Sequence, residues 1–156
     1  MAELDVGVTA PDFDLPRDGG GRVNLAAFKG KPVVVFFYPK DDTSGCTVES
    51  IAFTRLAPDF AAAGAVVIGM SPDSVKRHDK FVKKHALAVI LASDETRTTL
   101  EAYGVWKEKS LYGRKYMGVE RTTFLIGPDG HISTIWNKVK VEGHAEDVLK
   151  AVSTHS

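Results

Sequence analysis

Six consecutive apolar or aromatic residues, Val33 to Tyr38, constrain the fold more than any other feature of the sequence. The run is rich in β-branched and aromatic side chains and contains no polar residue, which is typical of a strand that is covered on both faces. A second apolar run, Val66 to Met70, follows after a helical pattern. A strand, a helix and a second strand in this order favour parallel pairing, so we expect an α/β fold.

The helix between these strands has apolar side chains near one face. We expect Pro58 to kink or end it, because a proline inside a helix costs about 3 kcal/mol. The expected apolar face comprises Val48, Ile51, Ala52, Leu56 and Phe60.

The remaining patterns complete a mixed sheet with helices around it. We expect a turn at Gly19-Gly20-Gly21 between two short strands, so that the chain begins with an N-terminal β-hairpin extension. The other expected elements are a helix over Asp73–His85, a strand over Leu87–Leu91, a helix over Asp94–Tyr103 opened by Asp94, a loop over Trp106–Glu120, a hairpin of Thr122–Ile126 with Ile132–Trp136, and a closing helix around Ala145–Val152. The 156 residues then form a single domain, 1–156.

Composition excludes several classes of function. The chain has 20 Lys plus Arg and 20 Asp plus Glu, with a formal net charge of zero. No basic footprint is present, so we expect neither nucleic-acid binding nor binding to an anionic membrane. The acidic start Met1-Ala2-Glu3-Leu4-Asp5 lacks the features of a secretory signal, and no apolar stretch is long enough to span a bilayer. These observations predict a cytoplasmic protein.

The chain contains one cysteine, Cys46, which lies between the end of a buried strand and the start of a helix. In α/β folds ligand sites form at such places. Free backbone N–H groups and the positive end of the helix dipole favour an anion there, and a thiolate is one. Helix amino termini and nearby cations lower cysteine pKa values to roughly 3.5 to 7.5, so a thiolate nucleophile is one interpretation.

The other interpretation is that Cys46 is a small buried apolar residue, because free cysteines are among the most buried residue types. The polar neighbours Asp41, Asp42, Thr43 and Ser44 argue for a hydroxyl-lined turn. They equally suit ordinary helix capping. Spacing alone leaves both interpretations open.

The pattern Pro39-x-x-x-Thr43-x-x-Cys46 resembles the signature of the peroxiredoxins. The wider string Phe37–Thr47 is similar to that of the Q-type subgroup, also called bacterioferritin comigratory protein, although Ser44 stands where a proline is usual. Two further blocks, Tyr112–Leu125 and Lys138–His144, are similar to blocks of the same subgroup. The resemblance covers nearly the whole chain.

This resemblance implies a thioredoxin-like fold and a thiol-dependent peroxidase that needs no metal or other cofactor. Cys46 would attack hydrogen peroxide or an alkyl hydroperoxide and become a sulfenic acid. Thr43 would hydrogen-bond the peroxide, Pro39 would cover the sulfur, and the backbone near Gly45 would stabilise developing charge. The Glu-Arg-Thr-Thr-Phe block selects Arg121 as the cation that holds the thiolate, which spacing alone does not.

Glu49 lies three residues after Cys46 and so shares its helix face. We expect its carboxylate to orient an arginine or the backbone of the site. A solvated charge on the helix surface is the other interpretation.

No second cysteine is present to reduce the sulfenic acid. At the two positions where the family places one, this chain has Ile51 and Val82. The reductant must therefore come from outside, as a thioredoxin, a glutaredoxin or a small thiol. The resemblance also implies a monomer or a weak dimer.

Other classes fit less well. A thiol-disulfide oxidoreductase needs a Cys-x-x-Cys pair, and Thr43 occupies the first position of that pair. The histidines show no spacing typical of a zinc site. The remaining alternative is a redox sensor or binding protein whose Cys46 oxidises without turnover.

Overall fold

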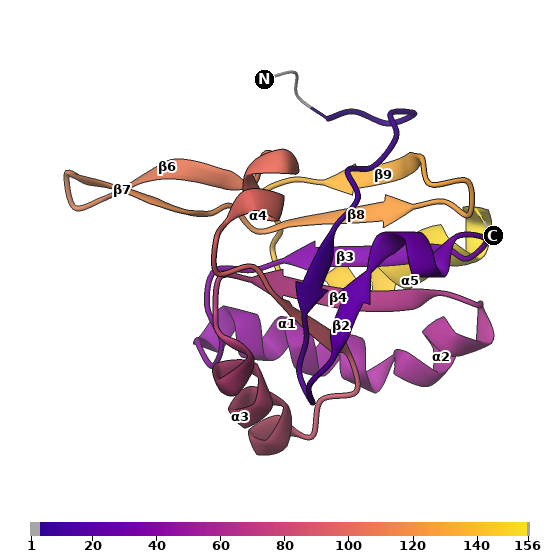
Figure 1. Ribbon diagram of the computed structural model, residues 1–156, viewed down its shortest axis with the longest axis horizontal. Coiled ribbons are helices and arrows are strands. Elements are labelled where there is room, and N and C mark those ends of the chain that lie inside the picture. Colours follow the sequence, from indigo (N-terminus) through magenta and orange to yellow (C-terminus); the bar gives the residue numbers. More distant parts are fainter. Residues whose placement is uncertain (1–3, 156) are drawn as a thin grey trace.

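The computed structural model describes residues 4–155, which are built around a five-stranded mixed sheet (Figure 1). The strand order is β5-β4-β3-β8-β9. The central strand β3 (Val33–Phe37) is buried throughout and lies parallel to β4 (Val66–Ser71) and antiparallel to β8 (Thr122–Ile126). The edges are β5 (Ile90–Ser93), parallel to β4, and β9 (Ile132–Trp136), antiparallel to β8. The predicted α/β class, the parallel pairing and the second hairpin are confirmed.

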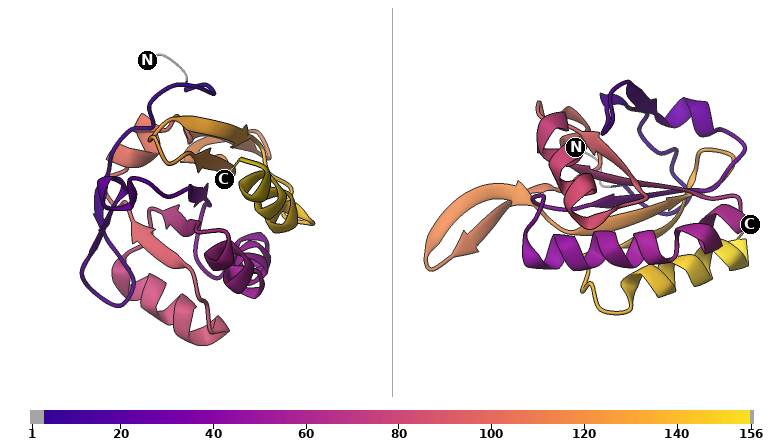
Figure 2. Two further views of the ribbon diagram at one scale, coloured as in Figure 1. Left: turned by 90° about the vertical axis from the view of Figure 1, so that its right-hand side faces the viewer. Right: turned by 90° about the horizontal axis from the view of Figure 1, so that it is seen from below.

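Among the described residues, four helices cover one face of this sheet, and the other face is covered by the amino-terminal segment and the short helix of residues 98–102 (Figure 2). The side chains of Val34, Phe36 and Tyr38 point to the helical face, because alternate residues of a strand share a face. The helices on this face are α1 (Ser44–Arg55), α2 (Ala57–Ala62), α3 (Val75–His85) and α5 (His144–His155). Helix α4 (Thr98–Ala102) lies on the opposite face, where Leu100 belongs to the second core. Pro58 occupies the first turn of α2, so it ends the first helix as predicted.

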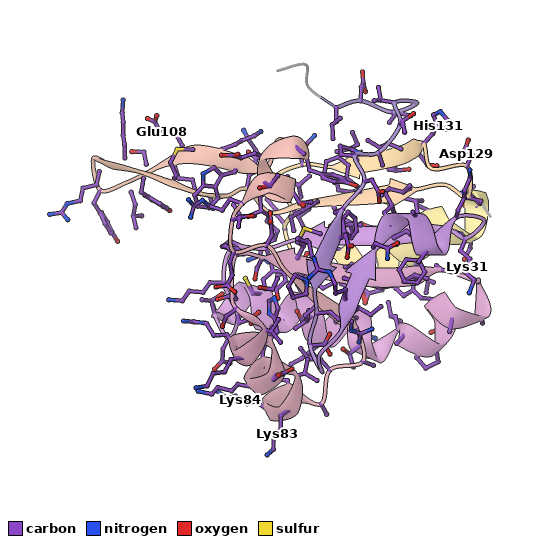
Figure 3. The ribbon with its side chains drawn as sticks, in the orientation of Figure 1. Lys31, Lys83, Lys84, Glu108, Asp129 and His131 are labelled. Carbon is purple, nitrogen blue, oxygen red and sulfur yellow. The ribbon has the colours of Figure 1, made fainter. Side chains whose placement is uncertain are left out.

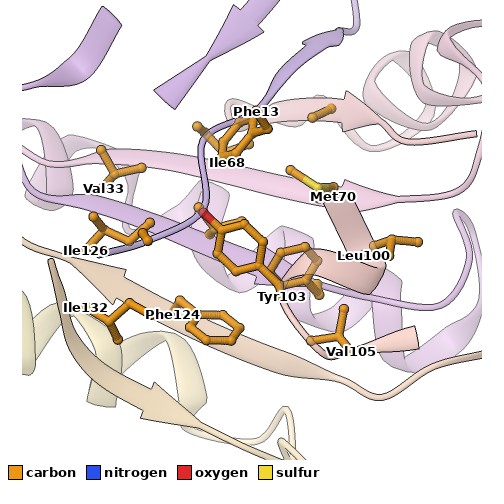
Figure 4. Packing of buried hydrophobic residues seen from close by; sticks show 14 of the residues in the cluster. Phe13, Val33, Ile68, Met70, Leu100, Tyr103, Val105, Phe124, Ile126 and Ile132 are labelled. Carbon is orange, nitrogen blue, oxygen red and sulfur yellow. The ribbon is translucent and has the colours of Figure 1, made fainter. Parts of the chain in front are cut away.

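Aromatic rings pack together in the hydrophobic cores on both faces of the sheet. On the helical face Phe36 stacks on Phe53 of α1 with ring centroids 4.6 Å apart. This packing requires Gly69 in β4, since a Cβ there would come within 2.6 Å of the Phe36 ring. On the opposite face Tyr103 packs edge-on against Phe124, with centroids 5.1 Å apart (Figure 4).

The amino-terminal segment crosses the sheet and pairs with both of its edges. Residues 7–10 hydrogen-bond with residues 130–132 at the start of β9. The hairpin of β1 (Asp14–Pro16) and β2 (Arg22–Asn24) follows, with the predicted glycine turn between its strands. That turn lies against the free side of β5, where Asp18 exchanges hydrogen bonds with Leu91 through its backbone and side chain. A short 3-10 helix, Leu25–Phe28, completes the segment.

The segment predicted as a loop is a third hairpin, made of β6 (Trp106–Leu111) and β7 (Arg114–Val119). The prediction was wrong because the many charged side chains lie on a ribbon exposed to solvent over most of its length, which stands away from the sheet (Figure 1). Its two-residue turn, Tyr112-Gly113, has positive φ at both positions, as a tight hairpin requires.

Three other predictions need correction. In the apolar face assigned to the first helix, Val48 and Ile51 are 52% and 43% exposed, so the prediction is wrong for these two residues. Ala52, Leu56 and Phe60 pack against the core. The strand predicted over Leu87–Leu91 runs instead from Ile90 to Ser93. The helix predicted from Asp94 begins at Thr98, after a turn in which Arg97 has φ of 65°. Asp94 still accepts the N–H of Leu100 through its carboxylate, at 2.8 Å.

In the part of the chain that the structure describes, no helix is both long and apolar enough to cross a bilayer. The same residues contain no group of three or more His, Cys, Asp or Glu side chains arranged to hold a metal ion.

Candidate active site

Cys46 lies in the first turn of α1, directly beyond the carboxyl end of β3. The turn between them places residue 43 at the N-cap, so Cys46 is the third residue of the helix. The backbone N–H groups of a first turn have no acceptor within the helix, and their dipoles favour negative charge. The sulfur atom belongs to the helical-face core, and the residue has no exposed surface. It is therefore a shielded sulfur at an electropositive helix end.

Arg121 is the cation that contacts this sulfur. It lies in the short connection between β7 and β8, 75 residues from Cys46 in the sequence. One guanidinium nitrogen, Nη2, donates to Cys46 Sγ at 3.2 Å, and the other, Nη1, donates to Glu49 Oε1 at 2.7 Å. The planar guanidinium group thus joins the sulfur and the carboxylate in one fixed geometry.

Glu49 lies one turn after Cys46 on the buried face of α1 and is 1% exposed. Burial raises the pKa of Glu49 to about 7, although the charge and hydrogen bond of Arg121 act in the opposite direction. Its second oxygen, Oε2, has no hydrogen-bond partner among residues 4–155. The carboxyl group fixes Arg121 at a high desolvation cost, which favours a role in the site over that of a solvated surface charge.

Gly45 makes room for this arrangement. A Cβ atom at this position would lie 3.2 Å from Arg121 Nη2 and 3.8 Å from its Cζ. Any side chain would therefore press on the guanidinium group that holds Cys46. The glycine is needed here for close approach of an arginine, since its backbone does not have a positive φ.

The other two predicted residues lie on the turn that precedes α1. Thr43 is exposed, and its hydroxyl donates to the carbonyl of Lys40 at 2.9 Å rather than to Cys46. Pro39 is half-buried, two residues beyond the end of β3. Within the described chain, the one hydrogen bond to Cys46 Sγ comes from Arg121.

A buried polar network beneath the turn between β3 and α1 was not predicted from the sequence. The Asp41 carboxylate accepts the Tyr38 hydroxyl and contacts His78 Nδ1, each at 2.6 Å. His78 Nε2 lies 2.9 Å from the carbonyl oxygen of Ala92, so both ring nitrogens face acceptors, an arrangement that favours the imidazolium form. The Asp41 N–H donates to Asp73 Oδ2. The sequence gives only a weak indication of this pair: His78 lies among the residues of α3, and Asp41 follows the buried strand β3.

Helix α3 also holds the next residue of the turn. Asp42 has φ of 61°, and its carboxylate accepts from Lys84 at 2.7 Å and contacts His85 at 3.0 Å. These partners lower the pKa of Asp42, first through the hydrogen bond of His85 and then that of Lys84. Figure 3 labels Lys84 on α3, near the lower edge of that view. The turn before Cys46 is thus fixed to α3 at two successive residues.

A His78→Gln protein is expected to lose about 1–3 kcal/mol of unfolding free energy, because the amide leaves buried polar groups imperfectly paired. Burial alone lowers the pKa of His78, but the hydrogen bond and charge of Asp41, the Ala92 carbonyl and the charge of Asp73 raise it overall. The imidazolium therefore stabilises the fold below the ordinary histidine pKa, and this contribution disappears as the pH rises through the raised value. Urea unfolding below and above neutral pH measures the difference.

The matched control is His85→Gln, which removes the other histidine that faces this turn, at a partly exposed pair. We expect a change below about 1 kcal/mol for it. An equal cost of His78→Gln at both pH values would contradict the assignment of an imidazolium.

Comparison of the sequence with known proteins identifies a family and several relatives. Residues 6–135 match the model of the AhpC/TSA family. The chain is 49% identical to a putative peroxiredoxin Bcp of Coxiella burnetii, over 94% of this chain and 97% of that protein. It is 44% identical to peroxiredoxin Bcp of Bacillus subtilis, over 98% of each chain.

A solved structure of the Xanthomonas campestris bacterioferritin comigratory protein superimposes with a TM-score of 0.90. The two sequences are 43% identical, and the match covers 99% of each chain. That protein is described for its alkyl peroxide reduction activity, in complexes with a trapped intermediate and a ligand.

Proposed function

This chain belongs to the AhpC/TSA family and is a peroxiredoxin, and from this premise we propose that Cys46 is the residue at which it reduces peroxides. The fold is thioredoxin-like and the activity is that of a thiol-dependent peroxidase, which takes a peroxide as substrate and a thiol as reductant. The observation that supports the assignment of the residues most strongly is the single guanidinium group that contacts both Cys46 Sγ and Glu49.

In the first half-reaction the Cys46 thiolate attacks one oxygen of the peroxide O–O bond. An S–O bond forms, the O–O bond breaks, and the leaving oxygen takes a proton to depart as water or an alcohol. Arg121 holds the sulfur as an anion and stabilises charge that moves onto the peroxide oxygens. We assign to Glu49 the positioning of Arg121, and to the N–H groups of Gly45 and Cys46 the binding of the developing charge.

Thr43 and Pro39 belong to the same proposal as parts of the turn that receives the peroxide. The Thr43 hydroxyl donates to Lys40, which leaves its oxygen lone pairs free to accept a hydrogen bond from a peroxide O–H. Pro39 lacks an N–H group and so presents no donor that would hold water over the sulfur. Both hydrogen peroxide and alkyl hydroperoxides fit this chemistry.

In the second half-reaction an external thiol reduces the Cys46 sulfenic acid. The chain has no other cysteine, and the residues at the positions considered for one are Ile51 and Val82. Thioredoxin, glutaredoxin and small thiols are the classes of reductant proposed. We further propose one domain over residues 1–156, a monomer or weak dimer, and a cytoplasmic location, where thiols stay reduced.

Anaerobic stopped-flow mixing of the reduced protein with hydrogen peroxide, between about pH 4 and pH 9, tests the proposal. We expect oxidation far faster than that of a free thiol and a sulfenic acid that can be trapped at Cys46. Oxidation no faster than that of a free thiol would remove the peroxidase assignment of this site. It would favour the alternative of a redox sensor on the same fold.

A further inference from the structure

His144, the first residue of α5, is a buried polar residue to which the mechanism above gives no part. It is 5% exposed, and its Nε2 atom lies 2.8 Å from Oγ1 of Thr123, a residue of β8 with no exposed surface. A buried imidazole and a buried hydroxyl cost free energy unless they pair, so this contact ties the start of α5 to β8.

Thr123 shares one face of the sheet with Arg121. Thr123 lies directly opposite Phe36 of β3, and opposite residues point to the same side of a sheet. Phe36 belongs to the helical-face core, so the Thr123 side chain points toward the helices. Arg121 reaches the same side, since its guanidinium group contacts two residues of α1. The two residues are two positions apart in the chain, so a displacement of Thr123 would also displace Arg121.

On the side of the helices, His144 packs against Phe53 of α1. The two rings meet edge-on with their centroids 6.0 Å apart, and Phe53 lies one turn after Glu49 on the same buried face. Helices α1 and α5 lie side by side on this face of the sheet (Figure 2). Two successive layers thus join α1 to β8. Arg121 with its two partners forms the first, and His144 with its two partners forms the second.

The segment that leads into α5 also holds Arg121 by its backbone. Val139, in the connection between β9 and α5, donates its N–H to the carbonyl oxygen of Arg121 at 2.9 Å. One continuous segment, residues 139–144, therefore fixes the arginine backbone at one end and contacts Thr123 at the other. A shift of this segment would move the backbone from which the guanidinium group extends.

The charge state of His144 suits this position. Burial lowers the pKa of His144 to about 4, and the charge of Arg121 also lowers it. The acidic residues in the first turn of α5, Asp147 and Glu146, act in the opposite direction. The ring is therefore neutral at neutral pH and adds no second positive charge near the guanidinium group.

We propose that His144 is a positioning residue for Arg121, which holds the start of β8 where the contact of the guanidinium group with Cys46 requires it. The imidazole acts through Thr123 and Phe53 rather than by contact with the peroxide. This inference rests on the proposed function, because it concerns the geometry of the first half-reaction.

Stopped-flow oxidation of Cys46 by hydrogen peroxide tests this role in two variants of His144. Phenylalanine keeps a ring that packs on Phe53 but cannot hydrogen-bond Thr123, whereas glutamine can place an amide near the position of Nε2. We expect His144→Phe to be oxidised roughly 10- to 100-fold more slowly, the scale of a misplaced reacting group. Its profile of rate against pH should move to higher pH, because the thiolate is held less well. His144→Gln should retain most of the rate.

Thr123→Val removes the other partner of the same hydrogen bond and should slow oxidation to a similar degree. In an Arg121→Ala background, neither this change nor His144→Phe should slow the reaction further, because both act through the arginine. A residue with a structural role alone would lower the free energy of unfolding and leave its effect on the rate the same in both backgrounds.

Val148→Ala is the matched control. Val148 lies one turn after His144 on α5, has no exposed surface and belongs to the same core. Its truncation removes packing but no polar contact, so thermal unfolding should occur at a lower temperature with little change in the oxidation rate.

Oxidation of His144→Phe and Thr123→Val as fast as that of the unaltered protein would overturn the inference. An equal loss of rate in Val148→Ala, or slowing of the same size in the Arg121→Ala background, would overturn it as well. If His144→Phe does not fold, Thr123→Val decides the question by the same measurement. Oxidation of the unaltered protein no faster than that of a free thiol would instead contradict the proposed function. Fast oxidation of the unaltered protein and of both variants would contradict this inference alone.

Discussion

A Cys46→Ser protein is expected to lose peroxide reduction completely, while its fold persists. A serine hydroxyl stays protonated at neutral pH and is a far weaker nucleophile than a thiolate. No other cysteine in the sequence can take over. The replacement is similar in shape but places a hydroxyl in a fully buried site, so the free energy of unfolding should fall by about 1–3 kcal/mol. Peroxide consumption in the presence of excess thiol, together with thermal unfolding, measures both quantities.

Ser44→Ala is the matched control for Cys46→Ser. It alters an exposed side chain in the same helical turn, and we expect it to keep most of the activity. Turnover by Cys46→Ser above the rate of the thiol alone would show that the reaction does not pass through this sulfur. A Cys46→Ser protein that fails to unfold cooperatively would leave the comparison to chemical blocking of the thiol in the unaltered protein.

Arg121→Ala is expected to slow oxidation of Cys46 by roughly 100- to 1,000-fold, the usual cost of removing a preorganised donor from developing charge. The profile of rate against pH should also shift to higher pH, because the thiolate loses the cation that stabilises it. Arg121→Lys should fall between the two proteins. A lysine keeps the charge, but it lacks the planar group that contacts Cys46 and Glu49 together.

Removal of this guanidinium group also leaves Glu49 buried without its ion-pair partner. The pKa of Glu49, already raised to about 7 by burial, should then rise further because the opposing effect of Arg121 is gone. The carboxyl group can protonate, so the loss of stability should be larger at alkaline pH than at acidic pH. Adding Glu49→Gln to Arg121→Ala should recover part of that stability without restoring the rate, and the double-mutant cycle measures the coupling.

Arg55→Ala is the control for the loss of an arginine. Arg55 lies on the same helix as Cys46, and its ion pair with Glu146 is largely exposed to solvent. We expect little change in the oxidation rate and a stability change within about 1 kcal/mol. If Arg121→Ala were oxidised as fast as the unaltered protein, the cation would have no part in catalysis.

Local sequence patterns were enough to predict the buried sheet. The runs Val33–Tyr38 and Val66–Met70 carry apolar side chains on both faces, and such a pattern is typical of central parallel strands. The β6–β7 ribbon was missed because its charged residues occur on both faces and show no alternation with apolar ones. Its one local signal was Tyr112-Gly113, a two-residue turn with glycine second.

The site could be predicted only in part, because some of its contacts join residues that are far apart in the sequence. The position of Cys46 at a helix start follows from local sequence, whereas its contact with Arg121 spans 75 residues and depends on tertiary packing. The family resemblance selected Arg121 where spacing could not. The buried partnership of Asp41 with His78 likewise joins a turn to a distant helix. No periodicity in the sequence encodes such a pair.

The path of the amino-terminal segment bears on aggregation. The outer sides of β5 and β9 carry backbone groups to which a strand of another molecule could pair. One continuous stretch, from residue 7 to residue 19, engages parts of both sides. Proteolytic cleavage near Gly20 would therefore release this stretch and expose the unpaired backbone groups of both edge strands, β5 and β9. Damage there would lead to chain-to-chain assembly while the chemistry of the sulfur remained intact.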